Sequence, residues 1–192
     1  LNWIEYFLEA GHEVHLVSTF GAAPSLPLAS FDVVPVAFSS LKASAPSGSR
    51  ARKSGVWGAA SIHFRTMIRH WFGLLTLPQS ASRLSEIARQ VRPDLVHAMR
   101  IPYEGMLASR AALDAPLLTS VWGNDFTLHA ASNPWMASAT RHALAATCAL
   151  HTDCRRDLRL AEELGFSPQK PRVVLPGGGG VRSDIFFPPD QP

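Results

Sequence analysis

Residues 115–126 read Ala-Pro-Leu-Leu-Thr-Ser-Val-Trp-Gly-Asn-Asp-Phe. The apolar run from Pro116 to Val121 is typical of a central strand of a parallel sheet, which is buried on both faces. Trp122-Gly123-Asn124-Asp125 follows, so the chain turns polar at the carboxyl end of this strand. Ligands bind at that edge in open α/β sheets. The stretch therefore predicts a strand and a site together.

Strand and helix patterns alternate along the rest of the chain, which predicts a doubly wound, Rossmann-like parallel sheet in a three-layer α/β/α domain. We expect strands near residues 13–18, 94–99, 116–121, 147–151 and 172–175, parallel in one sheet, and an edge strand at 31–38, where Pro35 lacks an N–H. Helices are expected at 1–10, 56–77, 79–91, 103–113, 134–146 and, with Asp153 as N-cap, 154–164.

Composition narrows the class of protein. The 192 residues are 46% hydrophobic, enough for one domain with a core. No apolar run is long enough for a transmembrane helix, and the first residues do not resemble a signal peptide, so we expect a cytoplasmic protein. Cys148 and Cys154 match no metal spacing and are interpreted as core or near-core thiols.

Charge is segregated along the chain. The formal net charge is +3, yet residues 33–85 contain seven basic and no acidic side chains. Such a segment suits an anionic partner. We expect residues 50–77 to meet an anionic or amphiphilic acceptor, or to touch the inner face of a membrane peripherally; a core helix with solvated arginines is the alternative.

Four motifs together carry a resemblance to a known family. They are Gly11-His12-Glu13-Val14 after a helix, Arg92-Pro93-Asp94-Leu95-Val96-His97, Trp122-Gly123-Asn124-Asp125, and Val174-Leu175-Pro176 leading through glycines to Phe186. In order and spacing the chain resembles the N-terminal, acceptor-side half of a retaining GT-B glycosyltransferase of family 4.

That resemblance implies transfer of a hexose-like sugar from a nucleotide-sugar donor to a hydroxyl of a glycan, lipid or small-molecule acceptor, without a metal, cofactor or nucleic acid. It also implies a C-terminal domain that binds the donor. Residues 1–187 would form the N-terminal domain, with its first strand upstream of Leu1, and 188–192 would begin the interdomain linker. Residues 1–192 alone are then expected to be inactive.

The candidate site gathers where the expected strands end. Asp125 is the candidate catalytic residue, and the candidate substrate-binding residues are Arg100, Glu104, Trp122, Gly123, Asn124 and His129. The interdomain or phosphate-facing loop is Gly177, Gly178, Gly179 and Gly180, whose amides suit an anion.

Each assignment has a structural alternative. Asp125 also suits a turn cap, Trp122 a core residue, Arg100 with Glu104 a surface ion pair, His129 a solvated loop histidine and the glycine run a hinge. His97 is interpreted as a hydrogen-bonded core residue. A non-catalytic α/β binding module or another nucleotide-dependent Rossmann enzyme remains the alternative function. No Asp-x-Asp pair or His/Cys cluster indicates a metal site.

Overall fold

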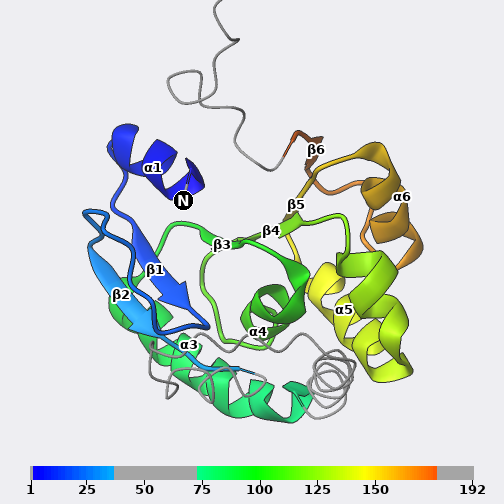
Figure 1. The fold of residues 1–192 in the computed structure, drawn as a ribbon, viewed down its shortest axis with the longest axis horizontal. Helices are drawn as coiled ribbons and strands as arrows, with labels where there is room; N and C mark the ends of the chain where they lie inside the picture. Colours follow the sequence, from blue (N-terminus) through cyan, green and yellow to red (C-terminus); the bar gives the residue numbers. More distant parts are fainter. Residues whose placement is uncertain (1, 37–72, 177–192) are drawn as a thin grey trace, which may run out of the picture.

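The computed structural model describes residues 2–36 and 73–176 (Figure 1). Several predictions lie outside this part: the end of the 31–38 strand, most of the 56–77 helix and of the basic 50–77 segment, the glycine run, and the linker at 188–192.

A four-stranded parallel sheet forms the centre of the molecule. Its strands, in the order β3-β4-β5-β6, are Val96–Ala98, Leu117–Val121, Ala149–Thr152 and Arg172–Val174. The register pairs His97 with Leu118, and Ser120 with His151. Four of the five residues of β4 are buried, as the apolar run at 116–121 predicts for a strand covered on both faces.

The prediction of one sheet is wrong in one respect. β1 (His15–Ser18) pairs in parallel with β2 (Ser30–Val33), and these two strands form a sheet of their own. β1 and β3 share no hydrogen-bonded ladder, and a cavity of about 310 Å³ is lined by residues of both strands. The remaining expected strands are parallel in one sheet, including the pair at 94–99 and 116–121.

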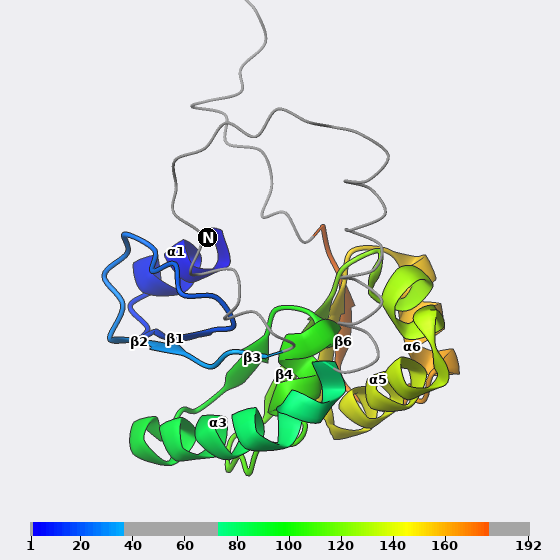
Figure 2. The same cartoon turned by 60° about the horizontal axis from the view of Figure 1, so that its bottom comes forward.

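Helices cover both faces, which gives a three-layer α/β/α arrangement. Figure 2 shows α1 (Asn2–Glu9) above the β1-β2 sheet and α3 (Leu77–Val91) below β3 and β4. The other described helices are the short α4 (Met106–Ala108), α5 (Pro134–Ala146) and α6 (Arg155–Glu163). Shorter turns are the 3-10 turns η2 (Gly73–Thr76) and η5 (Ala130–Ser132), and the π-type turns η3 (Ile101–Gly105) and η4 (Asp125–His129).

Local chemistry explains where the longer helices begin and end. α5 has the predicted bounds: Asn133 is extended and its side chain accepts a hydrogen bond from the Met136 N–H, and Pro134 occupies the first turn. α3 begins at Leu77, two residues before the expected start, because Pro78 suits a first helical turn rather than a stop. It ends before Arg92, which has a left-handed conformation and precedes a proline.

Two helix predictions need correction. The stretch 103–113 contains only η3 and α4; at its end the side chains of Ser109 and Arg110 donate to the Met106 carbonyl, which stops the helix. The N-cap of α6 is Cys154 and not Asp153, since Cys154 is the extended residue before the first helical one. The predicted stop at Gly165 is confirmed by its φ of +106°.

The core lies between the four-stranded sheet and the helices on one face. Its largest fully buried side chains include Leu77, Ile101, Met106, Met136 and Leu150. Burying each such side chain contributes about 1.5–3 kcal/mol before the entropy cost. This core fixes the ends of β3 and β4, from which the candidate site projects. Cys148, in contrast, is exposed, so its interpretation as a core thiol is wrong.

Candidate functional site

Arg100 and Asp125 meet where β3 and β4 end. Arg100 lies two residues beyond β3 and Asp125 four residues beyond β4, and adjacent parallel strands bring these ends to one edge. The Arg100 Nη2 atom lies 2.8 Å from Asp125 Oδ1. The sequence predicted both residues for this edge, but not their ion pair.

The Asp125 carboxylate is fully enclosed. Its exposed fraction is 0%, and Oδ2 accepts hydrogen bonds from the Ile101 N–H at 3.1 Å and the Trp122 N–H at 3.3 Å. Burial raises the pKa of the Asp125 carboxyl, while the Arg100 guanidinium and the two backbone N–H groups oppose that rise. These contacts tie the segments after β3 and β4 together. They favour positioning of the loop and of Arg100 over direct contact of the carboxylate with a substrate.

Arg100 is the more accessible member of the pair. Its side chain is 36% exposed, and the same Nη2 atom also donates to Asn124 Oδ1 at 3.3 Å. The structural alternative for Arg100 was a surface ion pair with Glu104, whereas the ion pair in the structure is with the buried Asp125. Because one nitrogen serves both internal partners, part of the guanidinium remains open to solvent and to an anionic or hydroxyl-bearing ligand.

The loop Trp122-Gly123-Asn124 is held from two sides. The Trp122 Nε1–H donates to the Met99 carbonyl, which attaches the half-buried indole to the end of β3. On the other side, Arg156 Nη2 donates to the Gly123 carbonyl at 2.9 Å. A Cβ at Gly123 would lie 3.4 Å from the same Nη2 atom, an ordinary van der Waals contact, so a small side chain would also fit here.

Arg156 and Asp157 are site residues that sequence reasoning missed. Both lie in the first turn of α6, where Asp157 is buried and its Oδ1 is 2.7 Å from Arg156 Nη2. Their position beyond the carboxyl end of β5 places them at the same edge of the sheet as Gly123. That position is the only feature of the sequence that points to them.

Glu104 and His129 occupy the borders of the site. Glu104 Oε1 accepts a hydrogen bond of 3.4 Å from Thr19, which lies just beyond β1, so the end of β1 joins this edge. His129 is half-buried at the end of η4, and its backbone N–H donates to the Asn124 carbonyl at 3.2 Å. The turn from 124 to 129 is thereby closed on itself.

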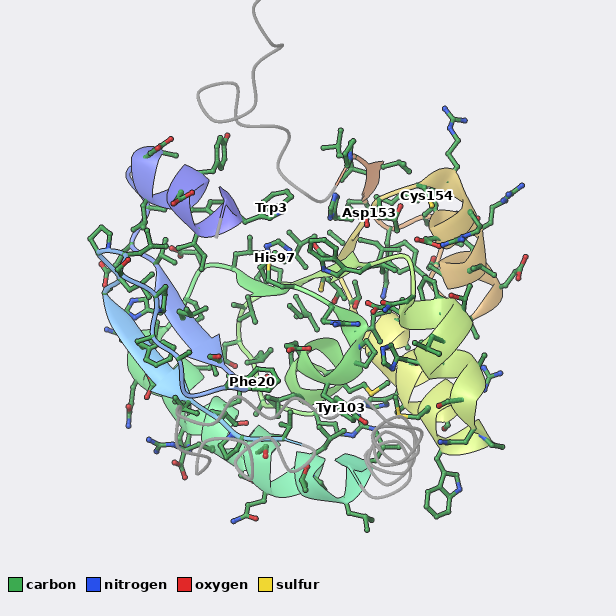
Figure 3. The ribbon with its side chains drawn as sticks, viewed as in Figure 1. Trp3, Phe20, His97, Tyr103, Asp153 and Cys154 are labelled. Atoms are coloured by element: carbon green, nitrogen blue, oxygen red, sulfur yellow. The ribbon has the colours of Figure 1, made fainter. Side chains whose placement is uncertain are left out.

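A chain of hydrogen bonds crosses the sheet beside the site. His97 Nε2 lies 2.8 Å from Ser120 Oγ, which lies 3.0 Å from His151 Nδ1, and His151 Nε2 lies 2.9 Å from the Leu175 carbonyl. The Trp3 ring packs edge-on against both histidines. Figure 3 shows Trp3 beside His97. Burial, assisted by His151, lowers the pKa of His97 to about 4. His97 is hydrogen-bonded as predicted, but it is half-buried and does not belong to the core.

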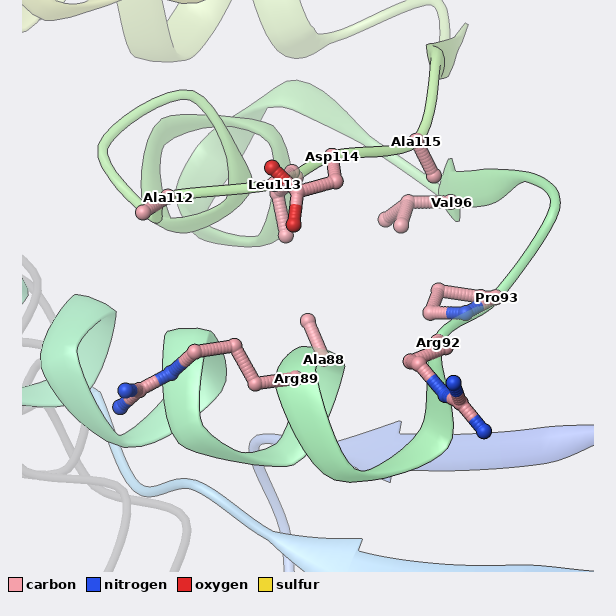
Figure 4. A pocket seen from close by; sticks show the side chains of 9 residues that line it. All are labelled: Ala88, Arg89, Arg92, Pro93, Val96, Ala112, Leu113, Asp114 and Ala115. Atoms are coloured by element: carbon pink, nitrogen blue, oxygen red, sulfur yellow. The ribbon is translucent and has the colours of Figure 1, made fainter.

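The opposite edge of the sheet carries a separate cavity of about 180 Å³ (Figure 4). It is lined by Arg89 and Arg92 at the end of α3 and by Asp114 of the segment before β4, together with Pro93 and Val96. It lies at the amino ends of β3 and β4, away from the edge where open α/β sheets bind ligands. We therefore place the candidate site at the Arg100 edge.

Within residues 2–36 and 73–176, no group of three or more His, Cys, Asp or Glu side chains is arranged to hold a metal ion. In the same residues, no helix has the length and apolar character that crossing a membrane requires.

Comparison with known proteins supplies the family. No curated protein gives a significant match to this chain. The family description "glycosyl transferase 4-like domain" matches residues 1–178, which is nearly the whole chain. Parallel strands flanked by helices, with the site at their carboxyl edge, are what one half of a GT-B glycosyltransferase requires. The chain belongs to the glycosyltransferase 4-like family and corresponds to the N-terminal domain of its members.

Proposed function

We propose that this chain is the acceptor-binding half of a retaining glycosyltransferase, which moves a sugar from a nucleotide-sugar donor to an acceptor hydroxyl. In that reaction the acceptor oxygen forms a bond to the anomeric carbon and loses its proton, and the diphosphate oxygen leaves with the bonding electron pair. The observation that supports an acceptor site here is the partly exposed Arg100, held rigidly by a buried carboxylate at the shared edge of β3 and β4.

Arg100 is assigned to binding. Its accessible guanidinium surface can donate to an acceptor hydroxyl or to an anionic group of the acceptor, and the exposed Asn124 amide beside it offers a second polar contact. Fixing such donors before the substrate arrives lowers the entropy cost of alignment.

Asp125 is assigned to positioning, although the sequence made it the candidate catalytic group. Removing the charge of Asp125 would break the ion pair with Arg100 and weaken the hydrogen bond from the Trp122 N–H. Any effect of the substitution on turnover would therefore come from the displaced Arg100 and Trp122. A direct role in transfer would need the carboxylate to leave the three partners that now enclose it.

We expect residues 1–192 alone to bind an acceptor without transferring sugar. A single half of a two-domain cleft cannot align donor and acceptor or exclude water from the reacting atoms. Release of nucleoside diphosphate from UDP-glucose or GDP-mannose by the isolated chain would contradict this expectation.

The binding assignment can be tested by NMR titration of the isotope-labelled chain with a panel of sugars, sugar phosphates and short-chain glycolipids. We expect the amides near Arg100, Trp122 and Asn124 to shift with one class of compound. Arg100→Ala should weaken that binding by about tenfold or more, the cost of one charge-assisted hydrogen bond.

Arg83→Ala is the matched control, because Arg83 is also an arginine in an ion pair, with Glu86 at 3.0 Å, but lies exposed on α3. Equal loss of binding in both variants, or shifts confined to other edges of the sheet, would refute the assignment. Binding of a ligand by the full-length protein without any transfer would favour a binding module.

A further inference from the structure

Two arginines from different elements hold the same turn after β4. Arg100, two residues beyond β3, donates through Nη2 to Asn124 Oδ1 at 3.3 Å, and Arg156 in the first turn of α6 donates through Nη2 to the Gly123 carbonyl at 2.9 Å. Gly123 and Asn124 are neighbours in the chain, and both are exposed. We call them the Gly123-Asn124 turn. Two guanidinium groups that are distant in the sequence are thus brought to one exposed turn.

Each of the two arginines is fixed by a buried aspartate of its own. Arg100 Nη2 lies 2.8 Å from Asp125 Oδ1, and Arg156 Nε and Nη2 lie 2.9 Å and 2.7 Å from Asp157 Oδ1. Both aspartates have an exposed fraction of 0%, whereas the two arginine side chains are 36% and 53% exposed. The accessible charge of these two ion pairs is therefore positive, and the buried carboxylates hold both guanidinium groups in place.

The hydrogen-bond acceptors of this turn are already occupied. The carbonyls of residues 122, 123 and 124 each accept a hydrogen bond, and Asn124 Oδ1 accepts from Arg100. The donors are not occupied: among residues 2–36 and 73–176, neither the Gly123 and Asn124 N–H groups nor the Nη1 atom of either arginine has an acceptor. The turn therefore offers unused donors and positive charge, while each of its oxygens already has a partner.

We propose that the Gly123-Asn124 turn binds a phosphate group carried by the acceptor, with Arg100 and Arg156 as its two cationic partners. The oxygens of an ionised phosphate only accept, and together they can pair with two guanidinium groups and with backbone N–H groups. A neutral sugar hydroxyl both donates and accepts, and it would find no unused acceptor here. The proposal rests on the proposed function only in assigning the phosphate to the acceptor; phosphate binding itself rests on the contacts of the turn.

Arg156 then has two roles, supporting the Gly123 carbonyl and contacting the phosphate. Its Nε and Nη2 atoms serve the first role, and Nη1 is available for the second. Arg155, the first residue of α6, provides a matched comparison: it carries the same charge in the same helical turn, but its exposed side chain has no hydrogen bond or ion pair with another described residue. A sugar phosphate and a phospholipid head group both carry the proposed phosphate, so the test must distinguish these two sources.

The test is NMR titration of the isotope-labelled chain with inorganic phosphate, glucose 6-phosphate, dihexanoyl phosphatidic acid and glucose. We expect the Gly123 and Asn124 amides to shift with the three phosphates, and glucose to bind at least about tenfold more weakly than glucose 6-phosphate. Arg156→Ala should weaken phosphate binding by about tenfold or more, and Arg156→Lys, which keeps the charge without the planar fork, by a smaller factor. Arg155→Ala should leave binding unchanged. The lower Kd of the sugar phosphate or of the lipid identifies the source of the phosphate.

Equal weakening by Arg155→Ala and Arg156→Ala would mean unspecific attraction of the anion and would overturn the proposal. The proposal also fails if glucose and glucose 6-phosphate bind equally and both Arg156 variants leave that binding unchanged, an outcome that keeps the acceptor site at Arg100. UDP is titrated in parallel, and tighter binding of UDP than of glucose 6-phosphate at the same amides would assign the turn to the donor and overturn the assignment to the acceptor.

If Arg156→Ala alters the amide shifts of β4 and β5, the Arg156→Lys variant decides between these outcomes. Failure of the proposed function has a different signature. In that case the turn of the full-length protein would bind phosphate with the same dependence on Arg156, but no sugar would be transferred to any phosphorylated compound.

Discussion

Asp125 is the residue on which the geometry of the candidate site depends. A carboxylate with no exposed surface is costly unless it is paired and hydrogen-bonded, and this one has a guanidinium and two backbone N–H groups as partners. The two backbone donors belong to different loops, so the side chain links the end of β3 to the end of β4. The main role of this polar cluster is therefore to hold the two loops together. As a result, Arg100 is kept in place at the edge of the sheet.

Asp125→Asn should lower the free energy of unfolding by about 2–3 kcal/mol, because the amide cannot pair with Arg100 and leaves a guanidinium in a partly buried place. Urea denaturation measures this loss. In a double-mutant cycle with Arg100→Ala the two losses should be less than additive, because both variants remove the same pair. Strict additivity would mean that the ion pair contributes nothing to stability.

His97 should make stability depend on pH. Its pKa is lowered to about 4 in the folded chain, so between pH 6.5 and pH 4 the unfolded chain binds the proton that the folded chain rejects. Stability is then complete above pH 6.5 and falls as the pH drops toward 4. The upper bound on the lost free energy of unfolding is about 3.4 kcal/mol. The actual loss should be smaller, because the partly exposed ring is screened by solvent.

Denaturation at a series of pH values, with His97→Gln as the variant, checks this expectation. The variant should lose part of the decline between pH 6.5 and 4. His142→Gln serves as the control, since His142 is exposed on α5. A decline identical in all three proteins would place the titrating group elsewhere.

At the scale of single elements, local chemistry decided what the sequence could predict. α5 could be predicted to the residue because Asn133-Pro134 is a strong start signal, and β4 because a short apolar run between Pro116 and Gly123 is nearly unambiguous. The helix after β3 is shorter than the predicted helix at 103–113. Its composition suits a helix, but the Ser109 and Arg110 side chains occupy the Met106 carbonyl, a contact that spacing does not reveal.

The same reasoning explains which site residues were found. Arg100 and the Trp122–Asp125 segment come soon after strands. They could be predicted because ligands of open α/β sheets bind at the carboxyl ends of the strands. The pairing of Arg100 with Asp125 rather than with Glu104 depends on how far each side chain lies from the strand ends. Arg156 approaches Gly123 from a helix 33 residues further along the chain, and no local pattern encodes that contact.

The N-caps of α5 and α6 differ, and substitutions at them should have opposite effects on stability. Asn133 caps α5 through its side chain, 2.9 Å from the Met136 nitrogen, so Asn133→Ala should cost about 1 kcal/mol. Cys154 has extended N-cap geometry but makes no capping hydrogen bond, so Cys154→Ser should stabilise the chain by about 0.5–1 kcal/mol. Thermal denaturation of both variants, beside Asn133→Ser as a conservative control, measures them. If the Cys154→Ser variant is less stable than the parent, packing of the thiol stabilises the chain more than a capping hydroxyl does.

The described part of the molecule consists of a four-stranded sheet with a packed core and a smaller unit of α1, β1 and β2. The described contacts between them include the Trp3 ring on His97 and His151, the Thr19 hydroxyl donating to Glu104 at 3.4 Å, and Ser80 of α3 donating to the Pro35 carbonyl at 2.8 Å. Among the described strands no hydrogen-bonded ladder joins the two parts, and the cavity of about 310 Å³ is lined by residues of both β1 and β3. We expect the smaller unit to open more readily than the sheet.

Trp3→Ala tests that expectation. The half-buried indole joins α1 to β3 and β5, so its loss should lower the opening free energy of α1, β1 and β2 by about 1–2 kcal/mol, which corresponds to roughly tenfold faster amide exchange there. Exchange in β4 and β5 should stay unchanged, because these strands are paired on both sides within the larger sheet. Tyr6→Ala is the matched control, since Tyr6 is an aromatic residue of the same helix that is 63% exposed. Equal acceleration in every strand would mean that both sheets unfold as one cooperative unit, and that contacts other than a shared ladder hold them together.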